Sequence, residues 1–189
     1  MDPSNPLAIN ALESTTVVVS LALLPAVALL VWAIAALRIR SGREPKASWR
    51  DTIAEVGAVA GTLPWLLLVL TPREGESAVQ LVPLVDLADL AAADPRTIVE
   101  QLVGNLVLFA AAGFFVPIRF PIGLGAVALW AAAGCTAVEA AQYLFGTGRV
   151  ASVDDVLLNT LGAVLAALAS RRWWRIRSQR DEAPALADR

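Results

Sequence analysis

The sequence predicts an all-α fold, namely a polytopic helical membrane protein with about five transmembrane helices. The 189-residue chain is 57% hydrophobic and only 17% charged, whereas about a quarter of the residues in a soluble domain are charged. Its apolar residues are gathered in long runs. The segments between these runs are alternately basic and acidic, as expected for loops on opposite sides of a membrane.

Five stretches reach the roughly 20 mostly apolar residues that a membrane-crossing helix needs. They cover residues 16–37, 52–71, 98–116, 121–144 and 153–170. Pro25 and Pro64 lie inside the first two, where neighbouring helices can cover the freed carbonyl groups. The segment before the first stretch has acidic residues but no Lys or Arg, so we expect a retained helix and not a cleaved signal peptide.

These stretches divide the chain into four parts, and nothing in the sequence indicates a soluble second domain. The parts are an extracytoplasmic N-terminal tail (1–15), two N-terminal transmembrane helices (16–71), a domain of three transmembrane helices (72–170) and a basic cytoplasmic tail (171–189). The third part begins with a long loop. We expect an interfacial helix in that loop, around the sequence DLADLAAAD.

Basic residues set the predicted orientation, because short cytoplasmic loops carry an excess of Lys and Arg. Basic residues gather between the first two spans (RIRSGREPKASWR), at Arg119, and after the last span (RRWWRIRSQR). The loop after the second span is instead rich in Asp and Glu. We therefore expect the N-terminus outside the cell and the C-terminus in the cytoplasm.

The composition excludes several functional classes. Histidine is absent, which removes His-based zinc sites and Ser-His-Asp triads. The single cysteine, Cys135, allows no disulfide within the chain, and its apolar surroundings indicate a buried thiol. The sequence also has no Gly-rich phosphate loop. We expect no cofactor, no metal ion and no nucleic-acid partner.

Three of the predicted spans carry a polar face, because residues spaced three, four or seven apart lie on one side of a helix. The residues are Gln101 and Asn105 on the third span, Glu139, Gln142 and Tyr143 on the fourth, and Asp155, Asn159 and Gly162 on the fifth. From the rise per residue, Asn105, Glu139 and Asn159 lie roughly 7–11 Å below the outer helix ends. We therefore predict a shallow polar pocket that opens outward, beneath Arg149 in the connecting loop.

This predicted pocket supplies the candidate site residues. The candidate ligand-binding residues are Asn105, Glu139, Gln142, Arg149, Asp155 and Asn159. Arg149 could meet a phosphate or carboxylate, and the amides could donate hydrogen bonds. Glu139 and Asp155 are also candidate catalytic residues, with Glu139 as general acid or base beside an ionised Asp155.

Structural roles stay open for the same residues. Asp154 and Asp155 lie in a first helical turn, where acids cap the helix and suit its positive dipole end. Others could act between helices: Glu139 and Arg149 as an ion pair, Asn105 and Asn159 through hydrogen bonds, and Gly162 through close packing. The Trp residues at positions 32, 65 and 130 could pack inside the protein or face lipid.

Two blocks of sequence are similar to the signature of a known family of membrane proteins. Gly104-Asn105 followed by LVLFAAAGFFVP is similar to the first block, N-x-x-x-F-x-P-x-G-x-x-x-P, and QLVPL at 80–84 is similar to the segment before it. VEAAQYLFGTGRVASVDDVLLNTLGA is similar to the second block, which places E-x-x-Q, R, D-D and N-x-x-G in that order. The departures are Gln80, Ala111 and Ser152, where the family often has asparagine, proline and aspartate.

The chain thus resembles VanZ-like membrane proteins over approximately residues 80–168. The resemblance implies that residues 72–170 form a VanZ-like domain and that the protein is a multi-pass protein of the bacterial plasma membrane. The family takes its name from an accessory glycopeptide-resistance protein that lowers susceptibility to teicoplanin. The resemblance therefore implies a connection with the cell envelope, but it supplies no reaction.

Three hypotheses of function follow. In the first, the pocket binds, or alters access to, a cell-envelope component or a lipophilic glycopeptide antibiotic. In the second, the protein is an intramembrane enzyme that acts on a lipid-linked envelope precursor, with Glu139 and Asp155 as acid and base. In the third, it is a partner subunit of a membrane complex. Membrane lipid is an expected partner in each, and the oligomeric state is left open.

Overall fold

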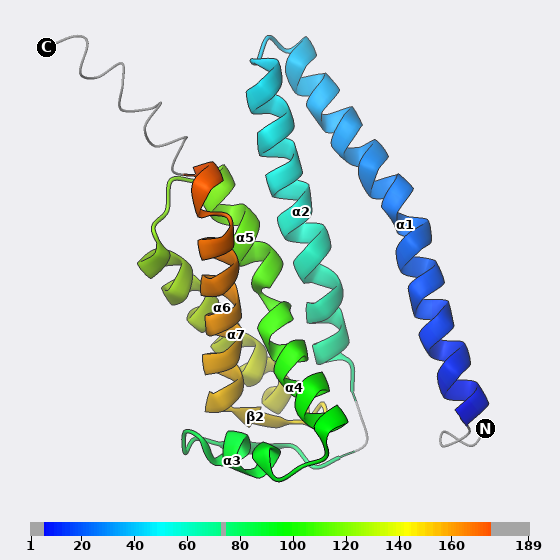
Figure 1. Ribbon diagram of the computed structural model, residues 1–189, viewed down its shortest axis with the longest axis vertical. Helices are drawn as coiled ribbons and strands as arrows, with labels where there is room; N and C mark the ends of the chain where they lie inside the picture. The colour runs from blue at the N-terminus through cyan, green and yellow to red at the C-terminus, as the bar shows by residue number, and fades with distance from the viewer. Residues whose placement is uncertain (1–5, 73–74, 175–189) are drawn as a thin grey trace, which may run out of the picture. The chain divides into compact units, whose positions relative to one another are not determined.

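A computed structural model describes residues 6–72 and 75–174 of the chain, with side chains from residue 22 onward (Figure 1). Its elements are α1 (Pro6–Arg40), α2 (Pro45–Leu70), β1 (Ala78–Gln80), α3 (Val85–Ala91), α4 (Pro95–Leu108), α5 (Ala110–Arg119), α6 (Leu124–Leu144), β2 (Val150–Ser152) and α7 (Val153–Ala169). The two strands have three residues each and every other element of the described chain is a helix. The all-α prediction is therefore confirmed.

Some predicted features lie outside the described residues, and others start earlier than expected. The predicted N-terminal tail, 1–15, is helical from Pro6 onward. Residues 1–5 and the basic cytoplasmic tail beyond residue 174 lie outside the described range. The chain forms two units, one that ends at Val56 and one that begins at Gly57.

Four helical segments of the described chain are long and apolar enough to cross a membrane. They are Ala22–Arg40, Pro45–Leu70, Pro95–Arg119 and Leu124–Leu144, and they correspond to the first four predicted spans. The predicted fifth span corresponds to α7, whose 17 residues lie at the short end of the range of about 17–25 for a membrane helix. The number of spans and their orientation stay predictions.

Large apolar side chains cover the outside of these segments. Trp32 is 59% exposed, Leu67 61% and Trp130 72%. Apolar surface of this extent is unfavourable in water and favourable against lipid. The side chains therefore support the assignment of an all-α polytopic membrane protein.

The first unit is a helical hairpin whose turn covers residues 41–44. Gly42 has a φ of +89°, in the left-handed region that glycine adopts at little cost. The Glu44 carboxylate accepts hydrogen bonds from the backbone N–H groups of Lys46 and Ala47, at 3.0 and 2.5 Å, and Pro45 needs no partner because it has no N–H. This cap starts α2 at Pro45, before the predicted boundary at residue 52.

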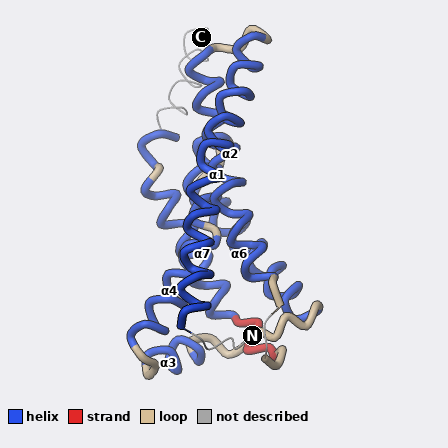
Figure 2. Tube along the Cα trace, turned by 90° about the vertical axis from the view of Figure 1, so that its right-hand side faces the viewer, coloured by secondary structure: helices blue, strands red, loops and turns tan. Residues whose placement is uncertain are grey.

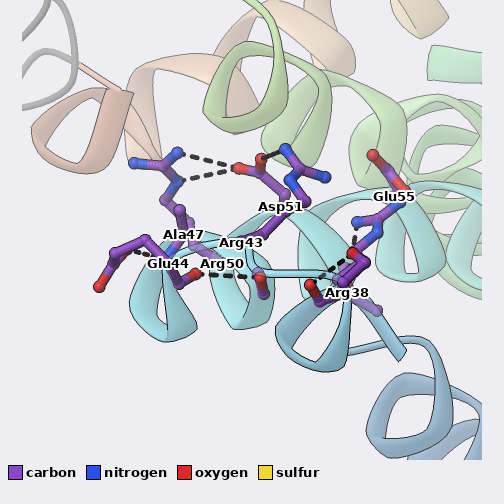
Figure 3. A network of polar contacts seen from close by, with 10 residues as sticks. Arg38, Arg43, Glu44, Ala47, Arg50, Asp51 and Glu55 are labelled. Atoms are coloured by element: carbon purple, nitrogen blue, oxygen red, sulfur yellow. Dashed lines mark hydrogen bonds and ion pairs between the residues drawn. The ribbon is translucent and has the colours of Figure 1, made fainter. Parts of the chain in front are cut away.

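Arginine ion pairs lie next to this turn, and one of them joins the two helices (Figure 3). Arg38 on α1 forms an ion pair with Glu55 on α2 at 2.5 Å. Asp51, which is 4% exposed, pairs with Arg43 at 3.4 Å and with Arg50 at 2.9 Å. Arg38, one of the basic residues that set the predicted orientation, thus also connects the helices on either side of the turn.

The second unit is built around α7, which packs against α4, α5 and α6 (Figure 1). The inward face of α7 carries Asn159, Gly162, Ala163 and Ala167, which are buried. The opposite face carries Leu157, Leu161 and Leu165, each about half exposed. The two faces repeat with helical periodicity, as expected for a helix that contacts protein on one side and lipid on the other.

Glycine lets α7 approach two neighbouring backbones. A Cβ atom at Gly162 would lie 2.0 Å from the backbone oxygen of Leu106 on α4, and one at Gly113 on α5 would lie 2.2 Å from the backbone oxygen of Ala163. Small residues at such crossings are typical of helix packing in membranes. The predicted close-packing role of Gly162 is confirmed.

The predicted third span, 98–116, consists of two helices. Asp94 caps α4 by accepting from the N–H groups of Arg96 and Thr97, both at 3.1 Å, and a hydrogen bond from the Thr97 hydroxyl lowers the pKa of Asp94 below its ordinary value. The helix therefore begins at Pro95. It ends at Phe109, which separates α4 from α5.

The break at Phe109 exposes backbone groups that a membrane helix must satisfy within the protein. The hydroxyl of Thr62 on α2 accepts a hydrogen bond from the backbone N–H of Ala112 at 3.2 Å. Gly61 makes this approach possible, because a Cβ atom there would lie 2.5 Å from the Cβ of Ala111. The chain thus interrupts the helix without a proline at position 111.

One end of the second unit carries the two strands, which the sequence did not predict (Figure 2). β1 and β2 pair in parallel, with Ala78 opposite Val150 and Gln80 opposite Ser152. The pairing attaches the long loop after α2 to the segment just before α7. The same loop contains α3, so the predicted helix around DLADLAAAD is confirmed.

Candidate binding cavity

A cavity of about 800 Å³ lies in the second unit, near the strands. Its lining comes from the end of α2, from α3 and α4, from the end of α6 and from the start of α7. It includes all six candidate ligand-binding residues: Asn105, Glu139, Gln142, Arg149, Asp155 and Asn159. The fold therefore brings together side chains that the sequence distributes over 55 positions, and their binding roles stay predictions.

Asn105 and Asp155 connect α4 with α7. The side-chain amide of Asn105 donates a hydrogen bond to Oδ1 of Asp155, which confirms the interhelical role considered for Asn105. A carboxylate can accept several hydrogen bonds, so this contact leaves acceptor capacity on Asp155 at the cavity wall.

Asn159 is 1% exposed and bonds within its own helix. Its Nδ2 donates to the backbone oxygen of Asp155 at 2.7 Å. The amide nitrogen of Asn159 therefore makes a hydrogen bond within α7, and the interhelical bond considered for it is wrong. Its Oδ1 is buried and has no hydrogen-bond partner among the described residues. Leaving such an acceptor unsatisfied costs about 1–3 kcal/mol, so a hydrogen-bond donor at this wall of the cavity would be stabilised.

Ser152 links Glu139 to the segment in front of α7. The backbone N–H of Ser152 donates to Oε2 of Glu139 at 3.1 Å. Its hydroxyl donates to the carboxylate of Asp86 and accepts from the backbone N–H of Asp154 at 3.1 Å. The serine that departs from the family pattern therefore caps α7 and connects it with α3 and α6.

Asp154 has a structural role that differs in part from the predicted one. It lies in the first turn of α7, as expected, but the N-cap of that helix is Ser152. The Asp154 carboxylate, 1% exposed, instead accepts from the backbone N–H groups of Leu84 at 2.6 Å and Leu87 at 3.1 Å. It thus caps α3, whose N-cap residue Leu84 has a positive φ of 68°.

Two predicted donors are engaged with the end of α2. The Nε2 group of Gln142 donates to the backbone oxygen of Val69 at 2.9 Å, and Nη2 of Arg149 lies 3.4 Å from that of Leu68. The last carbonyl groups of a helix lack partners within it. Gln142 and Arg149 therefore close the C-terminus of α2 and form part of the cavity wall at the same time.

Of two aromatic residues near the cavity, Tyr143 differs from its predicted position and Trp65 has a role that was not predicted. Tyr143, expected on the same face as Glu139, is 49% exposed and is not among the described residues that line the cavity. The helical turn directs Gln142 inward and Tyr143 outward. Trp65, expected to pack or face lipid, lines the cavity and adds an aromatic wall.

The sequence interpretation missed three acidic residues of the cavity, namely Asp86 and Asp89 on α3 and Glu100 on α4. These residues contributed only to the predicted orientation in the membrane. The i, i+3 spacing of Asp86 and Asp89 could have indicated a shared polar face on the predicted interfacial helix. Together with Glu139 and Asp155, they give the cavity an acidic lining.

Comparison with known proteins gives one family match. A family model described as VanZ/LLP1 matches residues 26–175, which is well over half of the chain and includes every residue of the cavity lining. The comparison with curated proteins gives no match, and the comparison with solved structures gives none either.

Proposed function

Since the chain belongs to the VanZ/LLP1 family, we propose that it is a bacterial plasma-membrane protein whose cavity binds the polar part of an amphiphilic molecule. The molecule is a cell-envelope component or a lipophilic glycopeptide antibiotic of the teicoplanin type. Binding alters the access of that molecule to its target at the outer membrane surface. The observation that carries the proposal is the gathering of six polar side chains around one cavity.

The composition of the cavity wall supports an amphiphilic ligand. The polar residues Glu139, Gln142 and Asn159 are buried, and apolar residues such as Leu90 and Val138 lie beside them in the lining. Small-molecule sites commonly combine an apolar wall with a few placed polar groups and have volumes of about 300–1,000 Å³. A ligand with a polar head and an apolar chain satisfies both parts of the wall next to the membrane.

The variants Asn159→Ala and Arg149→Ala test this proposal. We expect each variant to bind the ligand about tenfold more weakly. Asn159→Ala removes a buried polar group from the cavity wall, and Arg149→Ala removes the side chain that meets the C-terminal end of α2 at this wall. Native mass spectrometry of the purified protein measures this as reduced occupancy by a co-purified lipid-sized mass. In a strain whose teicoplanin tolerance depends on the protein, both variants should lower tolerance at equal protein level.

Tyr143→Phe is the matched control, because Tyr143 lies on α6 with its side chain half exposed. This variant should keep both the bound mass and the tolerance of the unchanged protein. Equal occupancy and equal tolerance in all three variants, with equal amounts of folded protein, would contradict the proposal.

The cavity also supports a second candidate function, an intramembrane enzyme that acts on a lipid-linked envelope precursor. Glu139 and Asp155 line the same cavity from adjacent helices, as an acid and a base acting on one substrate must. Purified protein incubated with lipid-linked precursors should then change their mass, and Glu139→Gln should abolish the change. Precursors of unchanged mass would leave binding without chemistry.

A further inference from the structure

We infer that the ligand of this cavity presents a primary ammonium group to Asn159 and to the carboxylates around it. This inference rests on the proposed binding function and adds the chemical class of the ligand. The head group of an aminolipid and an amino sugar of an envelope molecule both provide such a group. The inference differs from the sequence interpretation, which matched Arg149 with a phosphate or carboxylate.

The charge of the cavity wall favours a cationic ligand. Among the described lining residues, carboxylates are contributed by Asp86, Asp89, Glu100, Glu139 and Asp155, and a guanidinium only by Arg149. Glu100 pairs with Arg96 at 2.6 Å, which still leaves the acidic side chains in excess. Clefts lined by one sign of charge concentrate ligands of the opposite sign. The lining therefore favours a cation over a phosphate or a carboxylate.

The balance of donors and acceptors at Asn159 favours a ligand that donates a hydrogen bond. The amide nitrogens of Asn105, Gln142 and Asn159 each donate one hydrogen bond to a protein oxygen. Among these described amides, the buried atom without a hydrogen-bond partner is an acceptor, Oδ1 of Asn159. A ligand group that pairs with this oxygen therefore brings a hydrogen-bond donor. A phosphate in this position would bring acceptors only.

An ammonium group matches both the negative charge of the wall and the Asn159 acceptor that lacks a partner in the described chain. A primary ammonium carries a positive charge and three N–H donors, so it can pair with a carboxylate and still donate to Asn159. Hydrogen bonds of this charged kind are stronger than neutral ones. Trp65 in the same lining adds an aromatic face, to which cations are attracted. A cavity of about 800 Å³ has room for a lipid head group or a sugar as well as the ammonium.

The test compares probes that share a twelve-carbon chain and differ in the head group. The probes are dodecylamine, dodecyltrimethylammonium, dodecanol and dodecyl phosphate, each added to the purified full-length protein and measured by native mass spectrometry. Dodecylamine should bind about tenfold more tightly than the others, because dodecyltrimethylammonium lacks donors, dodecanol lacks charge and the phosphate is repelled. Higher salt should reduce its advantage.

Two variants locate the preference in the cavity. Asn159→Leu keeps the side-chain size and removes the acceptor, so it should reduce dodecylamine binding to the level of dodecyltrimethylammonium. Asp89→Asn removes one carboxylate from an exposed lining position and is expected to fold normally, so it should weaken both cationic probes and leave dodecanol unchanged. Tyr143→Phe should change nothing.

The outcomes separate this inference from the proposed function. If dodecyl phosphate or dodecanol binds as well as dodecylamine, and the cavity variants abolish that binding, the cavity binds amphiphiles and the ammonium inference is overturned. If no probe binds in a way that the variants change, the binding function itself is overturned. Displacement of dodecylamine by Mg²⁺ alone would identify a metal site and also overturn the inference. If dodecylamine is preferred, competition by phosphatidylethanolamine or by hexadecyl glucosaminide distinguishes an aminolipid head group from an amino sugar as the source of the ammonium group.

Discussion

Gly162→Ala should lower the free energy of unfolding. Overpacking usually costs about 1–3 kcal/mol, and we expect this change to lie in the upper part of that range. The added Cβ would lie 2.0 Å from the backbone oxygen of Leu106. A backbone oxygen cannot rotate away as a side chain can, so α4 and α7 must move apart. Because Asn105 and Asp155 bond across the same pair of helices, the shift also disturbs the cavity.

Thermal unfolding of the purified protein in detergent measures this effect as a midpoint several degrees lower, as expected for a chain of this size. Gly125→Ala is the control: it lies in α6, and a Cβ atom there would meet nothing within 4 Å. That change should leave the midpoint unchanged or raise it slightly, because alanine favours helix over glycine by up to about 1 kcal/mol. Equal midpoints for the two variants would show that the α4–α7 contact can adapt to a methyl group.

Asp154→Ala should release the segment that contains α3 from the start of α7. The substitution removes both acceptors from the backbone N–H groups of Leu84 and Leu87. Each lost partner costs about 1–3 kcal/mol where water cannot replace it. Leu84 is 61% exposed, so water replaces part of the loss there. We therefore expect local opening of this segment and not unfolding of the helices.

Hydrogen–deuterium exchange measures this opening directly. Amide protons of residues 78–93 should exchange at least about tenfold faster in Asp154→Ala, while those of α6 keep their protection. Asp154→Asn retains one oxygen and should have an intermediate effect. Asp89→Ala, an exposed change on the same short helix, should leave the exchange unchanged. Unaltered protection in Asp154→Ala would refute the anchoring role of this carboxylate.

The sequence was sufficient to predict the helices because their apolar runs are long, and it located the candidate residues because helical periodicity gives each polar residue a face and a depth. It predicted the helix ends less well. Glu44 and Asp94 are polar residues that start helices outside the apolar runs, so hydropathy alone cannot locate those ends. The break at Phe109 is equally invisible, since the hydrogen bond that accompanies it is accepted by Thr62, which is far away in the sequence.

The acidic half of the cavity could not be predicted for a related reason. Asp86 and Asp89 belong to a loop whose path depends on β1 pairing with β2 and on Asp154 binding the start of α3. These contacts join segments about 70 residues apart. Residue spacing along the chain carries no information about such contacts, whereas the spacing within one helix fixes Glu139 relative to Gln142.

The position of α7 in the chain has a consequence for how the protein is made. The helix is synthesised after α4, α5 and α6, which are the helices it contacts most. Until it emerges from the ribosome, Gly113 has no backbone to pack against and the loop with α3 has no carboxylate to hold it. Folding of the second unit therefore waits for a late segment, and its earlier helices must persist in the bilayer as separately inserted helices in the meantime.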